Sequence, residues 1–209
     1  MTEGAVAVVD YGMGNLRSVL NAVTALGRTA FVATEPADLR RAVAVILPGV
    51  GAFADGMRNL RDGGWVEPLQ RDVKNAGKPF LGICLGMELL ATGGMEHGWH
   101  EGLDWVAGVV DRLPAASSAI KVPHIGWNDV RIVREDGLYV GLGGHQSFYF
   151  VHSYYFAPRD AAVVSAVCGH GMEFAASVES DNVVGTQYHP EKSQKAGLAV
   201  LRNFLSRRA

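Results

Sequence analysis

The sequence predicts an α/β protein with an open, twisted, mostly parallel sheet, helices on both faces and antiparallel additions. In the first half of the chain, short apolar runs that end in turns alternate with stretches of helical periodicity. This alternation is typical of parallel strands covered by helices. After about residue 105, strand-like runs follow one another without intervening helices, so antiparallel strands are expected there.

The expected elements of the first half are short. Apolar runs predict strands at residues 5–9, 29–33, 42–47 and 79–83. Apolar residues at helical spacing predict helices at residues 16–26, 57–60 and 65–76, and Gly27 ends the first of these.

The second half is expected to contain six strands and one final helix. The strand-like runs are residues 108–113, 128–133, 147–156, 162–167, 173–178 and 183–188, and residues 195–205 form an amphipathic helix. Because no repeat, linker or low-complexity tract interrupts the pattern, we expect one domain over residues 1–209.

Composition limits the function classes. With 209 residues, of which 48% are hydrophobic and 19% charged, the chain can bury a sizeable core. Its net charge of -2 gives no reason to expect nucleic acid or an anionic membrane as a partner. The first residues lack a basic n-region, and the apolar run 5–9 is too short for a signal peptide or a membrane span, so we expect a cytoplasmic protein.

The two cysteines have different expected roles. Cys84 and Cys168 match neither a metal-binding spacing nor a disulfide framework, and we expect neither a metal nor another cofactor. Cys168 follows a strand-like run and is interpreted as a small core residue. Cys84 is expected to be a free reactive thiol, which fits a reducing compartment.

The most informative segment is residues 79–88, where an apolar strand runs into Gly82-Ile83-Cys84-Leu85-Gly86. This is the layout of a nucleophile elbow with Cys in place of Ser. Glycines are expected on both sides because a nucleophile on a tight strand-to-helix turn leaves no space for larger flanking residues. The helix after Cys84 is expected to favour the thiolate through its positive end.

A candidate base lies far downstream, in Gln187-Tyr188-His189-Pro190-Glu191. His189 can accept the thiol proton, and Glu191 can orient the ring, which completes a Cys-His-Glu triad. The alternative for Glu191 is a solvated acid at the surface.

The loop at residues 48–51 (Pro-Gly-Val-Gly) follows the third expected strand. Active sites of open α/β sheets form at the carboxyl ends of the strands, so this loop should lie beside the elbow. The backbone N–H groups of Leu85 and of Val50 or Gly51 are then candidates for an oxyanion hole. The alternative is a turn that merely ends the strand.

Two further patterns are weaker. Gly12-x-Gly14 lacks the third glycine of a dinucleotide fingerprint, which would fall at Arg17, so a tight turn at the functional rim is favoured. His97 and His100 lie among acids but lack further metal ligands at a recognisable spacing, so residues 96–101 are interpreted as a loop.

The motifs at residues 48–51, 82–86 and 189–191 resemble those of the class I glutamine amidotransferases. They occur in the order expected for that family, and the resemblance extends over nearly the whole chain. Further segments resemble the glutaminase subunits of imidazole glycerol phosphate synthases. They are residues 10–16, 122–128, 148–155 and 185–193. The resemblance implies a single-domain class I glutamine amidotransferase with a flavodoxin-like sheet.

The resemblance also implies a reaction. Glutamine would be hydrolysed to glutamate and ammonia through a thioester on Cys84. Ammonia would pass to a separate (β/α)8-barrel cyclase subunit, forming a heterodimer that acts in histidine biosynthesis. That partner would use a phosphoribulosyl-formimino-aminoimidazole carboxamide ribonucleotide and release imidazole glycerol phosphate and aminoimidazole carboxamide ribonucleotide.

Further residues acquire roles by the same resemblance. Those implied to hold glutamine are Gly51, Glu88, His152, Ser153 and Tyr154. The family is expected to have Gln where this chain has Glu88, so Glu88 either contacts glutamine or points into solvent. Asn15 and Trp127 are implied to lie toward the cyclase interface, and the less favoured alternative for Trp127 is ordinary core burial.

Two other functions remain open at this stage. A stand-alone hydrolase, such as a γ-glutamyl hydrolase, could use the same elbow without a partner. A non-catalytic binding module with a relic site is disfavoured, because a relic has no physical reason to retain all three triad groups.

Overall fold

The computed structural model describes residues 4–114 and 120–207. Within them, nine strands form one sheet in the order β2-β1-β3-β4-β13-β12-β11-β8-β9. These strands are β1 (Val6–Val9), β2 (Ala30–Ala33), β3 (Ala44–Gly49), β4 (Phe80–Cys84), β8 (His124–Ile132), β9 (His145–His152), β11 (Val164–Gly169), β12 (Glu173–Ser180) and β13 (Val183–Thr186). Each strand predicted from the apolar runs is present, with shifted ends.

One half of this sheet is parallel. The strands β2, β1, β3, β4 and β13 pair in parallel, and every residue of β1, β3, β4 and β13 is buried. Burial on both faces explains why these segments are continuous apolar runs rather than alternating ones.

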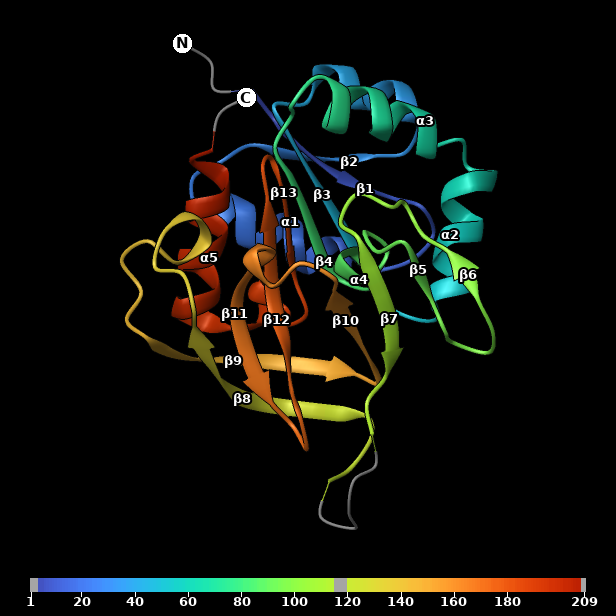
Figure 1. Cartoon of the computed structure of the whole chain (residues 1–209). Helices are drawn as coiled ribbons and strands as arrows, with labels where there is room; N and C mark the ends of the chain where they lie inside the picture. Colours follow the sequence, from blue (N-terminus) through green and yellow to red (C-terminus); the bar gives the residue numbers. More distant parts are fainter. Residues whose placement is uncertain (1–3, 115–119, 208–209) are drawn as a thin grey trace.

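The other half is antiparallel and larger than the sequence indicated. The four pairings from β13 through β12, β11 and β8 to β9 are all antiparallel. In Figure 1, β8 and β9 run crosswise to β4 and β13. β8 begins at His124, four residues before the strand predicted from residue 128. The prediction missed these four residues because their side chains alternate between the inward and outward faces and form no apolar run.

The predicted strand at residues 147–156 is two strands. β9 ends at His152, and β10 (Tyr154–Pro158) joins a second sheet with the order β10-β7-β5-β6. Its other members are β7 (Gly108–Arg112), β5 (Gly93–Gly94) and β6 (His100–Glu101). The loop expected at residues 96–101 therefore ends in a short strand. A strand of two residues is too short to produce a periodic pattern in the sequence.

Helices cover both faces of the large sheet, as predicted (Figure 1). They are α1 (Leu16–Ala25), α2 (Phe53–Asp62), α3 (Val66–Leu69) with a π-helical continuation at Gln70–Asn75, α4 (Leu85–Glu88) and α5 (Gln194–Leu205). Single-turn 3-10 helices, which the sequence did not indicate, occupy Gly137–Tyr139, Ala161–Val163 and Pro190–Lys192, and a longer one occupies Pro36–Arg41.

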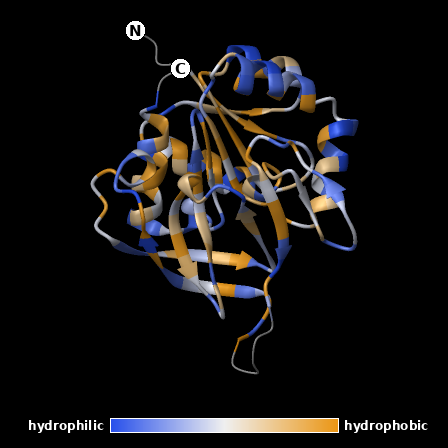
Figure 2. Ribbon diagram, viewed as in Figure 1, coloured by the Kyte–Doolittle hydropathy of each residue, from blue (hydrophilic) through white to orange (hydrophobic). Residues whose placement is uncertain are grey.

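Two hydrophobic clusters lie on the two faces of this sheet. α1 and α5 contribute Val19, Val23, Leu201 and Phe204 to one cluster, which also includes Cys168, the predicted core cysteine. Residues of α2, α3 and α4 contribute to the other cluster. The apolar strands in the middle of Figure 2, flanked by helices with hydrophilic outer faces, show the same layering. In the part of the chain that the structure describes, no helix combines the length and apolar character needed to cross a membrane.

Candidate active site

Cys84 is the last residue of β4 and adopts a strained backbone conformation, with φ 55° and ψ -111°. Only glycine occupies positive φ without strain, so surrounding contacts must hold this turn. The flanking glycines are required by close approach. A Cβ on Gly82 would lie 2.3 Å from the Gly86 carbonyl oxygen, and one on Gly86 would lie 1.9 Å from that of Leu47. The predicted elbow and the reason for its glycines are confirmed.

The expected effect of the following helix on the thiol is wrong for this structure. α4 has four residues, too few for a strong dipole. Burial is the largest influence and raises the pKa of the Cys84 thiol, and the Glu88 carboxylate raises it further. A hydrogen bond from the Leu85 backbone N–H lowers this pKa but does not compensate. The resting cysteine is therefore a protonated thiol, and a base must remove its proton.

His189 and Glu191 form a buried pair. His189 Nδ1 lies 2.8 Å from Glu191 Oε1, and the two side chains are 3% and 2% exposed. The alternative of a solvated Glu191 is therefore wrong. Because a carboxylate only accepts, Nδ1 carries the proton of the neutral ring and Nε2 presents its lone pair. His189 Nε2 is buried and has no hydrogen-bond partner among the described residues, so it is free to accept a proton.

The edge strand β9 contacts two members of the predicted triad, Cys84 and His189. The backbone N–H of His189 donates to the Tyr149 carbonyl at 2.9 Å, and Cys84 Sγ lies 3.8 Å from the Val151 carbonyl oxygen. Residues two apart on a strand are separated by about 6.7 Å, so β9 brings the two groups to one region. The thiol contacts the Val151 carbonyl and makes no hydrogen bond to His189 Nε2. Catalytic hydrogen bonds often form at full strength only when substrate binds.

A cavity of about 280 Å³ opens above Cys84. Its lining includes seven further residues that the sequence or the resemblance marked, namely Val50, Gly51, Leu85, Glu88, His152, Ser153 and Tyr154. It also includes Glu96, Pro123 and Val151, which sequence reasoning missed. Glu96 Oε2 accepts from the backbone N–H of Phe53 at 2.8 Å, and no local pattern marks it because only the fold brings it to Cys84.

The loop after β3 lies beside the elbow, as the parallel topology predicts. Gly49 pairs in register with Cys84, and Val50 and Gly51 continue into the cavity wall. Gly51 has φ +110°, and a Cβ there would meet Met13 at 2.7 Å. The backbone conformation therefore favours glycine at this position, whereas the terminal methyl group of Met13 could move aside. The loop is more than a strand-ending turn, and its role as part of an oxyanion hole stays a prediction.

Comparisons with known proteins agree with this geometry. Residues 7–207 match the family model described as glutamine amidotransferase class-I. The chain belongs to this family. The imidazole glycerol phosphate synthase subunit HisH of Moorella thermoacetica is 50% identical over 199 residues, covering 95% of this chain and 93% of that protein. The subunit HisH of Syntrophotalea carbinolica is 49% identical over 203 residues, covering 95% and 98%.

Solved structures support the fold alone. A crystal structure described as glutamine amidotransferase aligns with a TM-score of 0.75 at 22% identity, covering 97% of both chains. The structure of PurLQS from Thermotoga maritima aligns with a TM-score of 0.74 at 20% identity, covering 97% of this chain and 98% of that chain. The predicted fold class, a class I glutamine amidotransferase with an α/β sheet, is confirmed.

Glu88 stands where the amidotransferase resemblance led us to expect Gln. Its side chain is buried in the cavity wall, and its Oε1 accepts from Gln187 Nε2 at 2.8 Å. It does not point into solvent. Burial raises the pKa of Glu88 to about 8, and the charge of Glu96 adds to this effect, whereas the bond from Gln187 opposes it. At neutral pH Glu88 is therefore mainly a neutral carboxylic acid, which resembles Gln in charge.

Asn15 and Trp127, the residues expected at a partner interface, lie at the surface. Trp127 is 48% exposed and its ring meets Tyr149 edge-to-face, so the alternative of core burial is wrong. Asn15 is the N-cap of α1, and its side chain accepts from the Ser18 backbone N–H at 3.2 Å. Asn15 therefore has a structural role that the sequence did not indicate, and a partner contact stays a prediction for both residues.

Of the two weaker patterns, the one at Gly12 and Gly14 is the tight turn that was favoured. Gly12 and Gly14 have φ +84° and +109°, and a Cβ on Gly14 would lie 3.0 Å from the Pro48 carbonyl oxygen, so this segment is a tight turn against the 48–51 loop. Among residues 4–114 and 120–207, no group of three or more His, Cys, Asp or Glu side chains is arranged to hold a metal ion.

Proposed function

We propose that this chain is the glutaminase subunit of an imidazole glycerol phosphate synthase and delivers ammonia to a (β/α)8-barrel cyclase subunit in histidine biosynthesis. The single observation that supports the chemistry is the buried His189–Glu191 pair with its free Nε2, since the segments of His189 and of the strained Cys84 both contact β9. The named relatives, 49% and 50% identical, support the pathway and the partner. A cytoplasmic location is part of the proposal.

In the first half-reaction, His189 Nε2 takes the proton of Cys84 Sγ, and the sulfur attacks the side-chain amide carbon of glutamine. The amide oxygen becomes an oxyanion, for which the N–H groups of Leu85 and of Val50 or Gly51 are the proposed donors. The carbon–nitrogen bond then breaks, and protonated His189 gives its proton to the departing ammonia.

In the second half-reaction, His189 Nε2 removes a proton from water, whose oxygen attacks the thioester carbon; the carbon–sulfur bond breaks, glutamate leaves, and protonated His189 returns its proton to the Cys84 sulfur. Glu191 stabilises the imidazolium in both halves through its bond to Nδ1. Because burial keeps the thiol protonated at rest, proton transfer to His189 is required for each turnover.

Substrate contacts follow from the cavity lining. Gly51, His152, Ser153 and Tyr154 would hold the amino-acid end of glutamine, with backbone groups as the main partners. Glu96, an acid of the lining, is the proposed attraction for the α-ammonium group, and Glu88 adds to it above about pH 8, where its carboxyl group ionises. Asn15 and Trp127 would lie toward the cyclase.

The test is Cys84→Ala in the complex with the cyclase. Glutamine-dependent synthesis should be abolished, because only Cys84 can form the thioester, while synthesis from added ammonium salt should continue at the wild-type rate. Loss of the ammonia-dependent reaction would contradict the proposed division of labour. High glutaminase turnover by the wild-type chain alone, unchanged by the cyclase and its nucleotide, would instead favour a stand-alone hydrolase.

A further inference from the structure

A chain of side-chain hydrogen bonds runs from the cavity wall to the outer strands of the large sheet. His152 Nδ1 lies 2.7 Å from the Tyr154 carbonyl oxygen, and His152 Nε2 lies 2.9 Å from His124 Nδ1. His124 Nε2 lies 3.0 Å from Asn128 Nδ2, which also donates to the Gly169 carbonyl at 3.0 Å. The triad chemistry described above uses neither His124 nor Asn128.

The partners assign every proton in this chain. A carbonyl only accepts, so His152 Nδ1 must carry hydrogen, and its Nε2 then accepts from His124 Nδ1. His124 Nε2 is consequently an acceptor and receives one Asn128 amide hydrogen. The orientation of that amide follows independently, because Asn128 Oδ1 accepts from the Asp129 backbone N–H at 2.8 Å.

Both rings are neutral, as this assignment requires. Burial lowers the pKa of His152 to about 3 and that of His124 to about 4, and the charge of His170 also lowers both. The His124 ring is held between two rings, with centroids 4.7 Å from Phe150 and 4.1 Å from His170. It therefore cannot tilt away from His152 without breaking these contacts.

The bond from His152 to Tyr154 spans Ser153, where β9 ends and β10 begins. The Ser153 carbonyl accepts from the Leu113 backbone N–H at 2.9 Å, and the preceding Val151 carbonyl faces Cys84 Sγ. This short break thus forms the cavity wall and the contact with the nucleophile. A ring with the wrong tautomer at His152 would present a lone pair to the Tyr154 carbonyl and repel it.

We propose that His124 and Asn128 are positioning residues, which fix His152 as the Nδ1–H tautomer and thereby hold Ser153 and Tyr154 in the geometry that receives glutamine. This inference rests on the proposed function. It assigns the inward residues of β8 to substrate binding, although neither of them lines the cavity.

The test compares His124→Phe with His124→Asn in the full chain. Phe keeps a flat ring for stacking but offers no donor to His152 Nε2, whereas the Asn amide nitrogen can occupy the position of Nδ1 and donate. His145→Phe is the matched control, because His145 lies on β9 and is exposed. The probe is 6-diazo-5-oxo-norleucine, a glutamine analogue that alkylates active-site cysteines, with iodoacetamide as a reagent that needs no amino-acid pocket.

We expect His124→Phe to raise the half-saturating concentration of the analogue about tenfold, the effect of losing one well-placed hydrogen bond. His124→Asn and His145→Phe should stay close to wild type, and iodoacetamide should react with all four proteins at similar rates. An unchanged value for His124→Phe, or an equal loss in His124→Asn, would overturn the proposal.

A second measurement does not depend on any variant folding. Nitrogen-15 NMR of histidine-labelled wild-type chain should show His152 and His124 as neutral Nδ1–H tautomers at pH 6. An Nε2–H tautomer or a charged ring at either position would overturn the proposal. If the NMR assignment holds but the analogue does not react with the wild type, then the proposed glutaminase function fails while the hydrogen-bond chain stands.

Discussion

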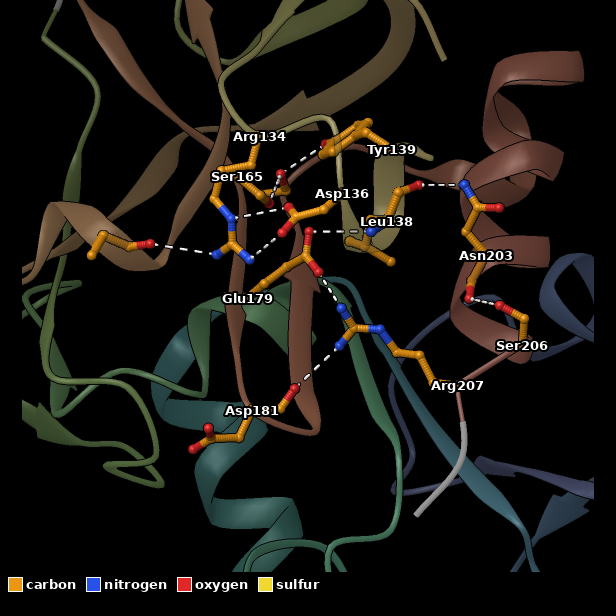
Figure 3. A network of polar contacts seen from close by, with 12 residues as sticks. Arg134, Asp136, Leu138, Tyr139, Ser165, Glu179, Asp181, Asn203, Ser206 and Arg207 are labelled. Atoms are coloured by element: carbon orange, nitrogen blue, oxygen red, sulfur yellow. Dashed lines mark hydrogen bonds and ion pairs between the residues drawn. The ribbon is translucent and has the colours of Figure 1, made fainter. Parts of the chain in front are cut away.

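Two buried polar regions of this protein are built in opposite ways. One joins β12, the turn at Gly137–Tyr139 and α5 (Figure 3). There the buried Glu179 accepts from Arg207 and from the Leu138 backbone N–H, and Asn203 donates to the Leu138 carbonyl at 2.9 Å. The hydroxyls of Tyr139 and Ser177 are 2.7 Å apart. Each of these groups has a partner, as buried polar groups normally do.

The other region is the proposed active site, where several buried polar atoms lack partners among the described residues. Among the described residues, four buried side-chain atoms lack a hydrogen-bond partner: Tyr11 OH, Gln187 Oε1, His189 Nε2 and Glu191 Oε2. All four belong to the site or its immediate support, and Cys84 adds backbone strain. The two regions therefore contribute differently to the free energy of folding. The network at Glu179 stabilises the fold, whereas the active site keeps binding capacity available for a substrate.

The largest effect should separate activity from stability. Glu191→Gln removes the charge that stabilises the His189 imidazolium, so kcat should fall by about 10²–10⁴-fold. The free energy of unfolding should change by less than about 1 kcal/mol, because Gln can still accept from Nδ1 and fills the same space. Steady-state kinetics of the complex and urea unfolding check both parts. A stability loss as large as the activity loss would place Glu191 in the structural class of Glu179.

The next prediction uses pH. Because the pKa of Glu88 is raised from 4.5 to about 8, folded Glu88 stays protonated while unfolded Glu88 ionises. Its stability contribution is full below pH 4.5 and is lost as pH rises toward 8, at up to about 1.4 kcal/mol per pH unit. Glu88→Gln should remove this decline, which urea unfolding at pH 5, 6, 7 and 8 measures. The exposed Glu67→Gln is the control and should decline like the wild type.

The same variant sharpens the account of the nucleophile. Glu88→Gln removes a charge that raises the pKa of the Cys84 thiol, so the apparent pKa for Cys84 alkylation should fall. The KM for glutamine, measured above pH 8 where Glu88 is ionised, should rise, because an attraction for the α-ammonium group is lost. Unchanged values in both assays would mean that the departure from the family pattern at this position is neutral.

In the hydrogen-bonded network around Glu179, Arg207→Met should destabilise the protein by about 2–3 kcal/mol, because it leaves the Glu179 carboxylate buried without its cation. The glutaminase KM should not change. The double variant Glu179→Gln with Arg207→Met should recover part of the loss, since no charge is then stranded. Additive losses in chemical denaturation would mean that the two side chains are not coupled.

The smallest expected effect comes from Tyr11→Phe. It removes a buried hydroxyl that has no partner, so stability should rise by about 1 kcal/mol. Thermal unfolding of this variant and of Tyr139→Phe makes the contrast, because the Tyr139 hydroxyl is bonded to Ser177 and its removal should destabilise. A loss of stability in both variants would mean that the hydroxyl of Tyr11 is not an unsatisfied group.

The parts predictable from sequence are those that local rules determine. Continuous apolar runs predicted the parallel strands, and Gly82 and Gly86 marked the elbow because backbone approach allows no Cβ there. The base was predictable because His189 and Glu191 are two residues apart and meet within one turn.

The unpredictable parts depend on contacts between distant segments. The break at Ser153 is set by His152 and Leu113, and Glu96 reaches the cavity only through the second sheet. The prediction of a lowered pKa for the Cys84 thiol is wrong because it rests on the position of the following helix. Burial has the larger effect on this pKa, and the sequence does not show how deeply Cys84 is buried.

The contacts of β9 have a consequence for anyone who moves this chemistry to another scaffold. The Cys84 sulfur and the His189 backbone are both held by a strand that contains neither residue, since the Val151 carbonyl contacts the first and the Tyr149 carbonyl contacts the second. A transplant that carries only the elbow and the His-Pro-Glu turn would lack β9, the strand that contacts both segments.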